Sequence, residues 1–317
     1  MKRKNIKLLA FLVLGGNLLA TSCSEEKTTE HKATQEEHTT QHDQVAEEEE
    51  TNTGFDVNSI ELDPDVNYQV PTPNELFTLI KETNVKFDES ILNDADNLSK
   101  YDSPKAQALN FGVYSADLAF ISSFEIGTEA LKYFKTIREL SNKLHVDNAF
   151  DGTVFKRIEE NANSGSKDSL LNLSNETYYK AFTYLEDNGR EKTLAYIVLG
   201  GWIESLYILT EVGTFEEGNT LAEKIGDQKL TLENIMGMMM KLQDDEEVTD
   251  VMSELQDLEE AFMNLEMVED GEVENTQQEN GTFMFSGGTK TIVTKDDFEK
   301  IKEIVKELRT QIVEGNL

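Results

Sequence analysis

Two acidic residues inside apolar segments are the side chains whose chemistry the sequence singles out. Asp117 lies within residues 106–124 and Glu204 within residues 193–210, and both segments are apolar on nearly every face of a helix. A helix that lacks a polar face belongs in the middle of a bundle, so both carboxyl groups are expected to lie out of contact with water. Because burial disfavours the charged form of a carboxyl group and raises its pKa, each acid needs a partner or a polar cavity.

Aromatic residues accompany both acids and allow two interpretations. Tyr114 precedes Asp117 by three residues, and Trp202 precedes Glu204 by two. In the first interpretation the four side chains form a ligand or ion site inside the bundle, with Tyr114 and Trp202 as its aromatic walls. In the second, the acids belong to a satisfied polar network that joins helices. We favour the second, since buried polar groups in proteins are as a rule hydrogen bonded within the structure.

The surroundings of the two acids resemble each other. Residues 112–118 can be laid on residues 200–206, 88 positions later, with glycines, aromatic residues and leucines in register and the acids offset by one. An internal duplication of a helical unit would leave this correspondence, although two buried helices share composition by necessity. Glycine costs about 1 kcal/mol relative to alanine inside a helix. Gly112, Gly200 and Gly201 therefore indicate close approach between helices.

The segment expected to fold lacks the residues of most familiar catalytic sites. His145 is its only histidine, and no His-Glu-x-x-His, phosphate-binding loop or Gly-x-Gly-x-x-Gly sequence is present. His31, His38 and His42 are spaced by seven and four residues in a polar segment, which is not the spacing of a metal site. We therefore expect no metal site and no cofactor.

A run of methionines at Met236, Met238, Met239 and Met240 is a further unusual feature. Methionine fills irregular gaps in cores, and this is the role that we expect for the run. Methionine also lines adaptable binding grooves, and its thioether binds Cu(I), so a groove and a copper site are the weaker alternatives.

Cys23 is the only cysteine of the chain and directly follows a short apolar run. Residues 2–4 are basic, residues 6–20 are predominantly apolar, and two small hydroxyl residues precede the cysteine. An apolar run of about 15 residues is short for a membrane span, which needs roughly 20. The order of basic, apolar and small residues indicates a signal peptide.

The sequence Leu-Ala-Thr-Ser-Cys at residues 19–23 resembles the lipobox of bacterial lipoproteins. In that family the cysteine is lipidated and becomes the first residue of the mature protein. The resemblance implies a signal peptide over residues 1–22, a palmitate-containing lipid on Cys23 and firm attachment to the membrane through that lipid. An ordinary cleaved signal peptide followed by a free thiol is the alternative. Residues 24–26, Ser-Glu-Glu, resemble the export signal of surface-exposed lipoproteins of the Bacteroidota. The cell surface and the periplasmic face of the outer membrane both remain open.

The charge of the chain limits its partners. The formal net charge is −33, and it becomes −37 without residues 1–22, which hold four basic and no acidic residues. Such a chain repels phosphate backbones, so nucleic acid is excluded as a partner. With one cysteine no internal disulfide can form, and the fold must be stabilised by burial of its core.

The chain divides into a signal peptide, a tether and one domain. Residues 23–54 are polar and acidic and cannot bury enough surface to fold, so we expect a disordered linker there. Residues 55–317 are expected to form a single all-α domain, a multi-helix bundle around two central buried helices. Serine, threonine and proline signals and apolar periodicity predict helices at 73–84, 88–100, 104–123, 128–144, 150–163, 168–187, 191–211, 215–226, 230–243, 245–268 and 295–313. A small β-hairpin is predicted before the last helix. Its two strands are residues 282–285 and 290–293, and Ser-Gly-Gly-Thr lies between them.

Blocks in the two apolar segments carry a second resemblance. Gly-Gly-Trp-Ile-Glu-Ser-Leu-Tyr at residues 200–207 and Phe-Gly-Val-Tyr at residues 111–114 resemble uncharacterised envelope lipoproteins of the Bacteroidota, of the Flavobacteria type. The resemblance implies a location in the cell envelope, at the outer membrane, and a helical fold. It implies no mechanism.

Two functions are compatible with the sequence. The first is a non-enzymatic, membrane-anchored binding or structural module that contacts another envelope protein or a small ligand. The second is a hydrolase that uses carboxylates to cleave envelope or extracellular glycans. Two acids about 5–10 Å apart in an open cleft would favour the hydrolase, because glycoside hydrolysis uses such separations. A sealed bundle would favour the binding module.

Overall fold

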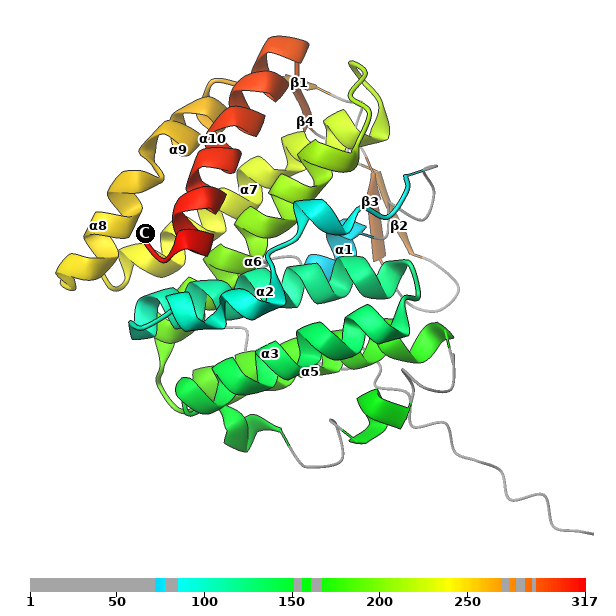
Figure 1. Ribbon diagram of the computed structural model, residues 1–317. Helices are drawn as coiled ribbons and strands as arrows, with labels where there is room; N and C mark the ends of the chain where they lie inside the picture. Colours follow the sequence, from blue (N-terminus) through cyan, green and yellow to red (C-terminus); the bar gives the residue numbers. More distant parts are fainter. Residues whose placement is uncertain are drawn as a thin grey trace, which may run out of the picture. The chain divides into compact units, whose positions relative to one another are not determined.

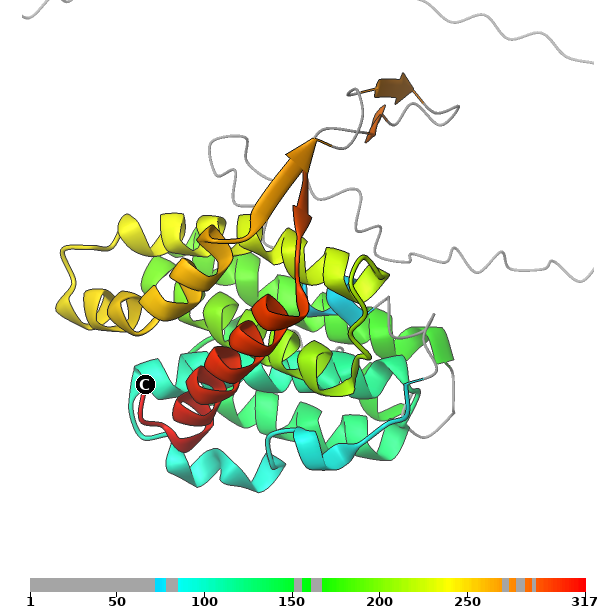
Figure 2. The ribbon, with the colours of Figure 1, turned by 90° about the horizontal axis from the view of Figure 1, so that it is seen from above.

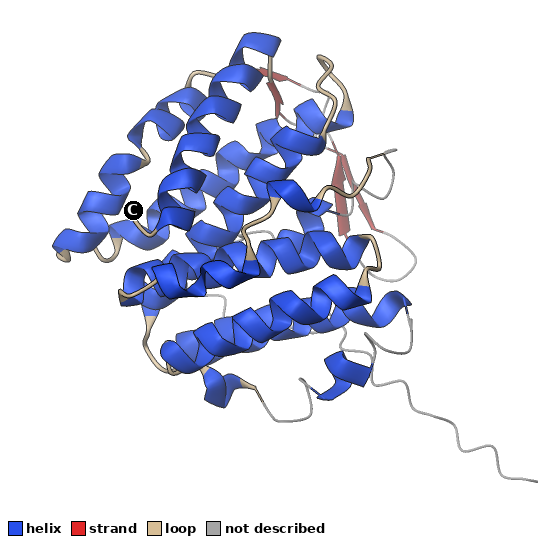
Figure 3. Cartoon of the chain, in the orientation of Figure 1, coloured by secondary structure: helices blue, strands red, loops and turns tan. Residues whose placement is uncertain are grey.

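A computed structural model describes residues 72–77, 85–150, 156–160, 167–269, 274–277, 283–286 and 289–317. The described chain is a multi-helix bundle with a small strand region before its last helix, as the sequence predicts (Figures 1 and 3). The α-helices are α1 (Pro73–Phe77), α2 (Pro104–Ser123), α3 (Gly127–Lys143), α5 (Lys167–Asp187), α6 (Glu191–Val212), α7 (Thr220–Met240), α8 (Glu246–Glu254), α9 (Gln256–Met263) and α10 (Lys295–Glu314). Shorter 3-10 turns are η3 (Glu89–Ile91), η4 (Ala95–Lys100) and η5 (Asp147–Ala149), and residues 156–160 are also helical.

The helices α2 and α6 form the centre of the bundle, as their apolar sequences predict. Nearly every residue of both helices is buried, and the two helices pack along each other. Figure 1 shows α3 and α5 on one side of α2, and α7, α9 and α10 on the other side. The helix α6 is the one described helix long and apolar enough to cross a membrane, and 94% of that stretch is buried inside the protein. Its apolarity is accounted for by its place in the core.

Side-chain caps fix the ends of the helices that matter for the site. Ser103 accepts a hydrogen bond from the main-chain N–H of Ala106 at the start of α2, with proline in the first turn. Thr294 and Asp297 form a reciprocal capping box at the start of α10. Gly315 ends α10 in the left-handed conformation, at φ 74°, which glycine adopts without strain. The predicted starts of α2 and α10 are confirmed.

The segment predicted as one helix over residues 88–100 consists instead of the two short turns η3 and η4. Asp88 accepts from the N–H of Ser90, and Asp94 accepts from the N–H of Asp96. These local bonds from aspartate to the main chain compete with a continuous helix and start a new turn at each aspartate. The prediction of a single helix was therefore wrong.

The two helices predicted at 215–226 and 230–243 are one continuous helix, α7. Gly226, which the prediction took as a helix end, lies in the interior of α7 and faces Thr291. A Cβ atom on Gly226 would lie 3.0 Å from the Cβ of Thr291. Glycine is thus needed at this position for close packing of a strand on the helix, not for ending the helix.

The helix predicted over 245–268 is divided into α8 and α9, and the chain leaves the helix after Met263. Residues Glu266–Glu269 form strand β1, which pairs antiparallel with β4 (Thr289–Ile292). Strands β2 (Glu274–Gln277) and β3 (Phe283–Ser286) form a second antiparallel pair. The predicted hairpin thus exists as a strand region, but β3 and β4 pair with strands that precede them and not with each other. Figure 2 shows β1 and β4 leading away from α9 and α10.

Several predicted features lie wholly or partly outside the described residues. The signal peptide, Cys23 and the linker over 23–54 are among them, as are the start of the domain up to residue 71 and residues 78–84 of the first predicted helix. Of the helix predicted over 150–163, residues 156–160 are described, and they are helical.

Candidate functional site

Close packing of α2 on α6 brings the two predicted acids together. A Cβ atom on Gly112 would lie 2.0 Å from the carbonyl oxygen of Ile197, and one on Gly200 would lie 2.0 Å from that of Leu109. Only glycine permits this approach of two helix backbones. The glycines predicted to mark close helix contacts are therefore at the contact between the two central helices.

Asp117 of α2 and Glu204 of α6 meet in the interior, and both side chains are 0% exposed. The two carboxyl groups are close enough to interact directly. Burial and, next, the charge of Glu204 raise the pKa of Asp117 well above its ordinary value, against the opposing effect of Arg309. Asp117 Oδ2 accepts from the main-chain N–H of Asn93 at 3.3 Å. Its Oδ1 meets no donor among the described residues, so a proton on Asp117 supplies the donor that the pair of acids needs.

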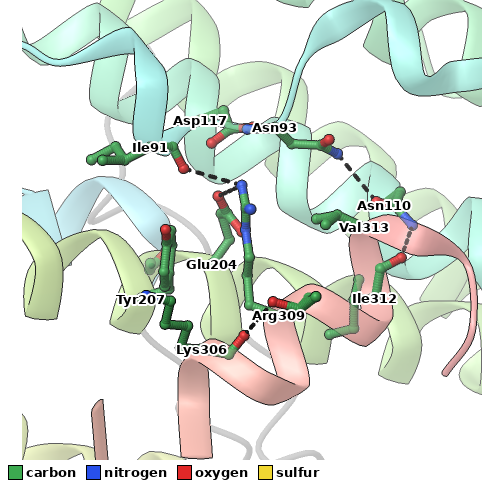
Figure 4. A network of polar contacts seen from close by, with 12 residues as sticks. Ile91, Asn93, Asn110, Asp117, Glu204, Tyr207, Lys306, Arg309, Ile312 and Val313 are labelled. Carbon is green, nitrogen blue, oxygen red and sulfur yellow. Dashed lines mark hydrogen bonds and ion pairs between the residues drawn. The ribbon is translucent and has the colours of Figure 1, made fainter. Parts of the chain in front are cut away.

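Arg309 of α10 is the partner of Glu204 (Figure 4). Its Nε and Nη2 donate to the two oxygens of the Glu204 carboxylate at 2.9 and 3.1 Å, the bidentate geometry that makes such pairs strong. Nη2 also donates to the carbonyl oxygen of Ile91 at 3.1 Å. The guanidinium carbon lies 4.7 Å from the ring centroid of Tyr207. Three parts of the chain, α10, α6 and η3, therefore meet at one side chain that is 14% exposed.

The charges of this cluster are balanced. Burial disfavours the charged guanidinium, but the charge of the adjacent Glu204 carboxylate and its hydrogen bonds to Arg309 outweigh this effect and raise the pKa of Arg309 above its ordinary value. One cation thus neutralises one carboxylate, and the raised pKa of Asp117 favours the neutral form of the second acid.

A second set of hydrogen bonds joins this cluster to the end of α10. Asn93 donates through Nδ2 to the hydroxyl of Tyr101 at 2.9 Å and to Oδ1 of Asn110 at 3.3 Å. Asn110 donates to the carbonyl oxygen of Ile312 at 2.8 Å, and Tyr101 donates to that of Val313 at 3.2 Å. The last carbonyl groups of a helix have no partner within it. Side chains from α2 and the η4 region supply those partners here and hold the last turn of α10 in the core (Figure 4).

Tyr114 lies beside the acids but takes no part in the carboxyl cluster. Its hydroxyl donates to the carbonyl oxygen of Asp94 at 2.8 Å. Its ring meets those of Tyr101 and Tyr133 edge to face, with centroids 6.3 and 6.0 Å away. Burial and the neighbouring Tyr101 raise the pKa of Tyr114 well above its ordinary value, so its hydroxyl is neutral and acts as a hydrogen-bond donor.

Trp202 lies on another side of α6. Two residues along a helix turn by about 200°, so Trp202 and Glu204 point in opposite directions. The indole N–H of Trp202 donates to Oε1 of Gln228 on α7 at 2.9 Å, and its ring centroid is 6.3 Å from that of Phe262 on α9. The structure therefore brings Asp117, Glu204 and Tyr114 to one region and directs Trp202 toward α7 and α9.

Arg309, Asn93 and Asn110 were missed by reasoning from the sequence. A signal did exist, because Arg309 follows the buried Val305 by four residues and precedes the buried Ile312 by three, which places it at the edge of the apolar stripe. The two asparagines carry no comparable signal, since Asn93 bonds the side chains of Tyr101 and Asn110 in other elements and Asn110 bonds the distant carbonyl oxygen of Ile312.

No cluster of three or more histidine, cysteine, aspartate or glutamate side chains suited to a metal ion occurs in the described part of the chain. The hollows that described residues line include two on the surface. One, of about 660 Å³, lies between η4 and α3 and is lined by lysines (Lys132, Lys135 and Lys143) and acids (Asp96 and Glu139) in addition to apolar side chains. The other, of about 170 Å³, lies between α7 and α9.

The cluster of Asp117, Glu204 and Arg309 joins three helices, and both of its carboxyl groups are 0% exposed to solvent. Compared with protein-family models, with curated proteins and with solved structures, the chain matches none.

Proposed function

We propose that the protein is a lipid-anchored module of the bacterial cell envelope, attached to the outer membrane through Cys23, that binds or supports another envelope component without catalysing a reaction. The location rests on the amino-terminal sequence, with its basic start, its short apolar run and its single cysteine. The choice of a non-enzymatic role rests on the buried carboxyl pair.

One observation carries that choice. A carboxylate-dependent glycan hydrolase holds two acids about 5–10 Å apart, with room between them for the sugar or a water molecule. Asp117 and Glu204 instead interact directly with each other, both are 0% exposed, and Arg309 pairs with Glu204 beside them. A hydrolase would have to use other acids. The pair is suited to fixing α2, α6 and α10 against one another, which makes the bundle a rigid body with its surface free for binding.

Metabolic labelling tests the anchor. Cells that produce the protein would be grown with labelled palmitate, and the protein would be isolated and compared with its Cys23→Ser variant. We expect label and membrane association in the first and neither in the second. Absence of label from the wild-type protein, or equal label in the variant, would refute the lipid anchor.

The binding role is tested separately. The lipidated protein would be crosslinked in native envelopes and purified, and its partners would be identified by mass spectrometry. A reproducible, stoichiometric envelope partner supports the proposal. If the purified protein cleaved envelope glycans, the Glu204→Gln variant would be assayed in the same way. Cleavage that persists in this variant would favour a hydrolase with a different set of acids.

A further inference from the structure

The hollow between α7 and α9 is an apolar groove, here called the α7–α9 groove. Leu232 and Phe262, which are 2% and 1% exposed, form its floor. Met236 and Met263 form its walls, and Met263 is 64% exposed. The ring of Trp202 packs on Phe262 from the inside of the protein. The groove therefore has a rigid aromatic base and flexible thioether walls.

Exposed apolar side chains are concentrated around this groove. The large hydrophobic residues with the greatest exposure in the described chain all lie within residues 230–267, and they are Leu230 (62%), Met240 (53%), Met263 (64%) and Met267 (52%). Met240 follows Met236 by four residues on α7 and so continues the same wall along the helix. A run of exposed apolar side chains beside a groove is typical of a surface that binds another protein.

Negative charge surrounds the groove. Residues 220–269 hold 14 acidic side chains and 3 lysines. Glu233 on α7 and Glu259 on α9 line the groove from its two sides. Lys229 is the third charged residue that lines the groove. Its Nζ lies 3.5 Å from the carbonyl oxygen of Met263 and 3.7 Å from the sulfur of Met267. The apolar floor thus lies between two acidic edges.

We propose that the α7–α9 groove binds the apolar face of a basic amphipathic helix presented by a protein partner. A groove with apolar walls between helices accepts the apolar face of a third helix. Methionine walls adapt to the side chains of such a helix, and acidic edges attract the lysines and arginines that flank its apolar face. A second copy of the chain does not fit, because two molecules that each carry a net charge of −33 repel each other.

This inference deepens the proposed function, on which it rests for the partner's location in the envelope. The groove itself is a property of the folded domain, so its binding can be measured without the lipid. Failure of palmitate labelling would refute the anchor and leave the groove untouched, whereas failure of the measurement below would refute the groove and leave the anchor untouched.

The probe is a synthetic peptide of about 18 residues, or five helical turns. Leucines are placed at i, i+3, i+4 and i+7 and lysines elsewhere, so that one face is apolar and the rest basic. A scrambled peptide of identical composition has no apolar face. The Cys23→Ser chain in detergent-free buffer is the binding partner, because detergent would itself bind the peptide. Binding is measured by fluorescence anisotropy of a fluorescein-labelled peptide.

Trp202 provides a readout specific to this site. It is the only tryptophan of the chain, and it lies directly beneath the floor of the groove. A tryptophan-free peptide that carries a nitroxide at the centre of its apolar face is expected to quench the emission of Trp202. A nitroxide on the basic face of the same peptide is expected to quench it less.

Two variants separate apolar contact from charge. Met263→Glu is expected to weaken binding about tenfold, although the added negative charge alone would strengthen attraction to a basic peptide. Reversal of both edges, in Glu233→Lys with Glu259→Lys, is also expected to weaken it about tenfold.

The control variant makes the same change in net charge elsewhere. It carries Glu139→Lys with Asp187→Lys, at exposed positions on α3 and α5. Figure 1 shows these two helices on the side of α2 opposite to α7 and α9. We expect it to change the affinity less than about twofold.

Saturable one-to-one binding of the amphipathic peptide, about tenfold tighter than that of the scrambled one, supports the proposal together with these variant effects. Equal binding of the scrambled peptide overturns it, because general attraction to an acidic protein would then be sufficient. Unchanged affinity in Met263→Glu overturns it as well, as does equal binding of a peptide with glutamates in place of the lysines. Self-association of the chain that Met263→Glu abolishes would assign the groove to a second copy and overturn the choice of partner.

Discussion

The buried acid Asp117 makes the stability of the protein depend on pH, and Asp117→Asn isolates that dependence. Asparagine has nearly the shape of a protonated aspartic acid and keeps the two polar contacts of the site. It can donate to the Glu204 carboxylate and accept from the N–H of Asn93, the two contacts that Asp117 makes. The substitution therefore removes the titration of one group and leaves the packing of α2 on α6 intact.

The sign and size of this pH dependence follow from the raised pKa of Asp117. Burial and Glu204 raise the pKa of Asp117 in the folded protein above the ordinary value of 3.8, so the folded protein binds more protons than the unfolded chain between the two values. As pH rises through this window, the unfolded chain releases its proton freely while the folded protein retains it. The contribution of Asp117 to stability falls by about 1.4 kcal/mol for each pH unit. The variant should gain this amount relative to the wild type for each pH unit of the window.

Urea unfolding followed by circular dichroism measures this difference at several pH values from about 4.5 upward. Both proteins would carry Cys23→Ser so that neither is lipidated. Asp102→Asn, at an exposed position next to the start of α2, is the matched control, and its difference from the wild type should stay flat with pH. A flat difference for Asp117→Asn as well, or one that falls as pH rises, would mean that Asp117 is ionised in the folded protein and would refute the charge assignment.

Three further substitutions test the packing around the same site. Arg309→Met leaves a buried carboxylate without its cation and should cost about 3–5 kcal/mol; adding Glu204→Gln should restore most of this loss, which a double-mutant cycle by urea unfolding would measure. Gly200→Ala places a Cβ atom 2.0 Å from the carbonyl oxygen of Leu109 and should lower the stability by about 3 kcal/mol or more, seen as a lower melting temperature. Asn110→Ala leaves a buried carbonyl group of α10 without its donor and should cost about 1–3 kcal/mol, with faster hydrogen exchange in the last turn of that helix.

The elements that could be predicted from the sequence are those whose signals are local. The central position of α2 and α6 follows from apolar residues on all helical faces, and the starts of α2 and α10 follow from Ser103 with its proline and from Thr294. These signals act within a few residues of one another. They hold in the folded protein because the tertiary structure agrees with them.

The predictions that were wrong concern residues with two possible roles. Gly226 ends a helix in one context and admits a neighbouring strand in another, and only the position of Thr291 decides between them. The sequence likewise showed that Asp117 and Glu204 needed a partner and could not name Arg309, since the choice of partner depends on where α10 packs. Glu204 and Arg309 are 105 residues apart in the sequence. The residues around Glu204 therefore do not indicate which distant side chain will pair with it.

The helix α6 connects the two unusual features of this protein. On one side Glu204 fixes it to Arg309 of α10, and on the opposite side Trp202 supports the floor of the α7–α9 groove through Phe262. A buried ion pair adds little net stability compared with apolar packing, but it permits one arrangement of the helices and disfavours others that would leave a charge unpaired. The position of the groove floor relative to the rest of the bundle is thereby fixed by a charge pair on the other side of the same helix. A binding surface built from flexible methionines gains most from such a base, because the walls can adapt to a partner while the floor stays in place.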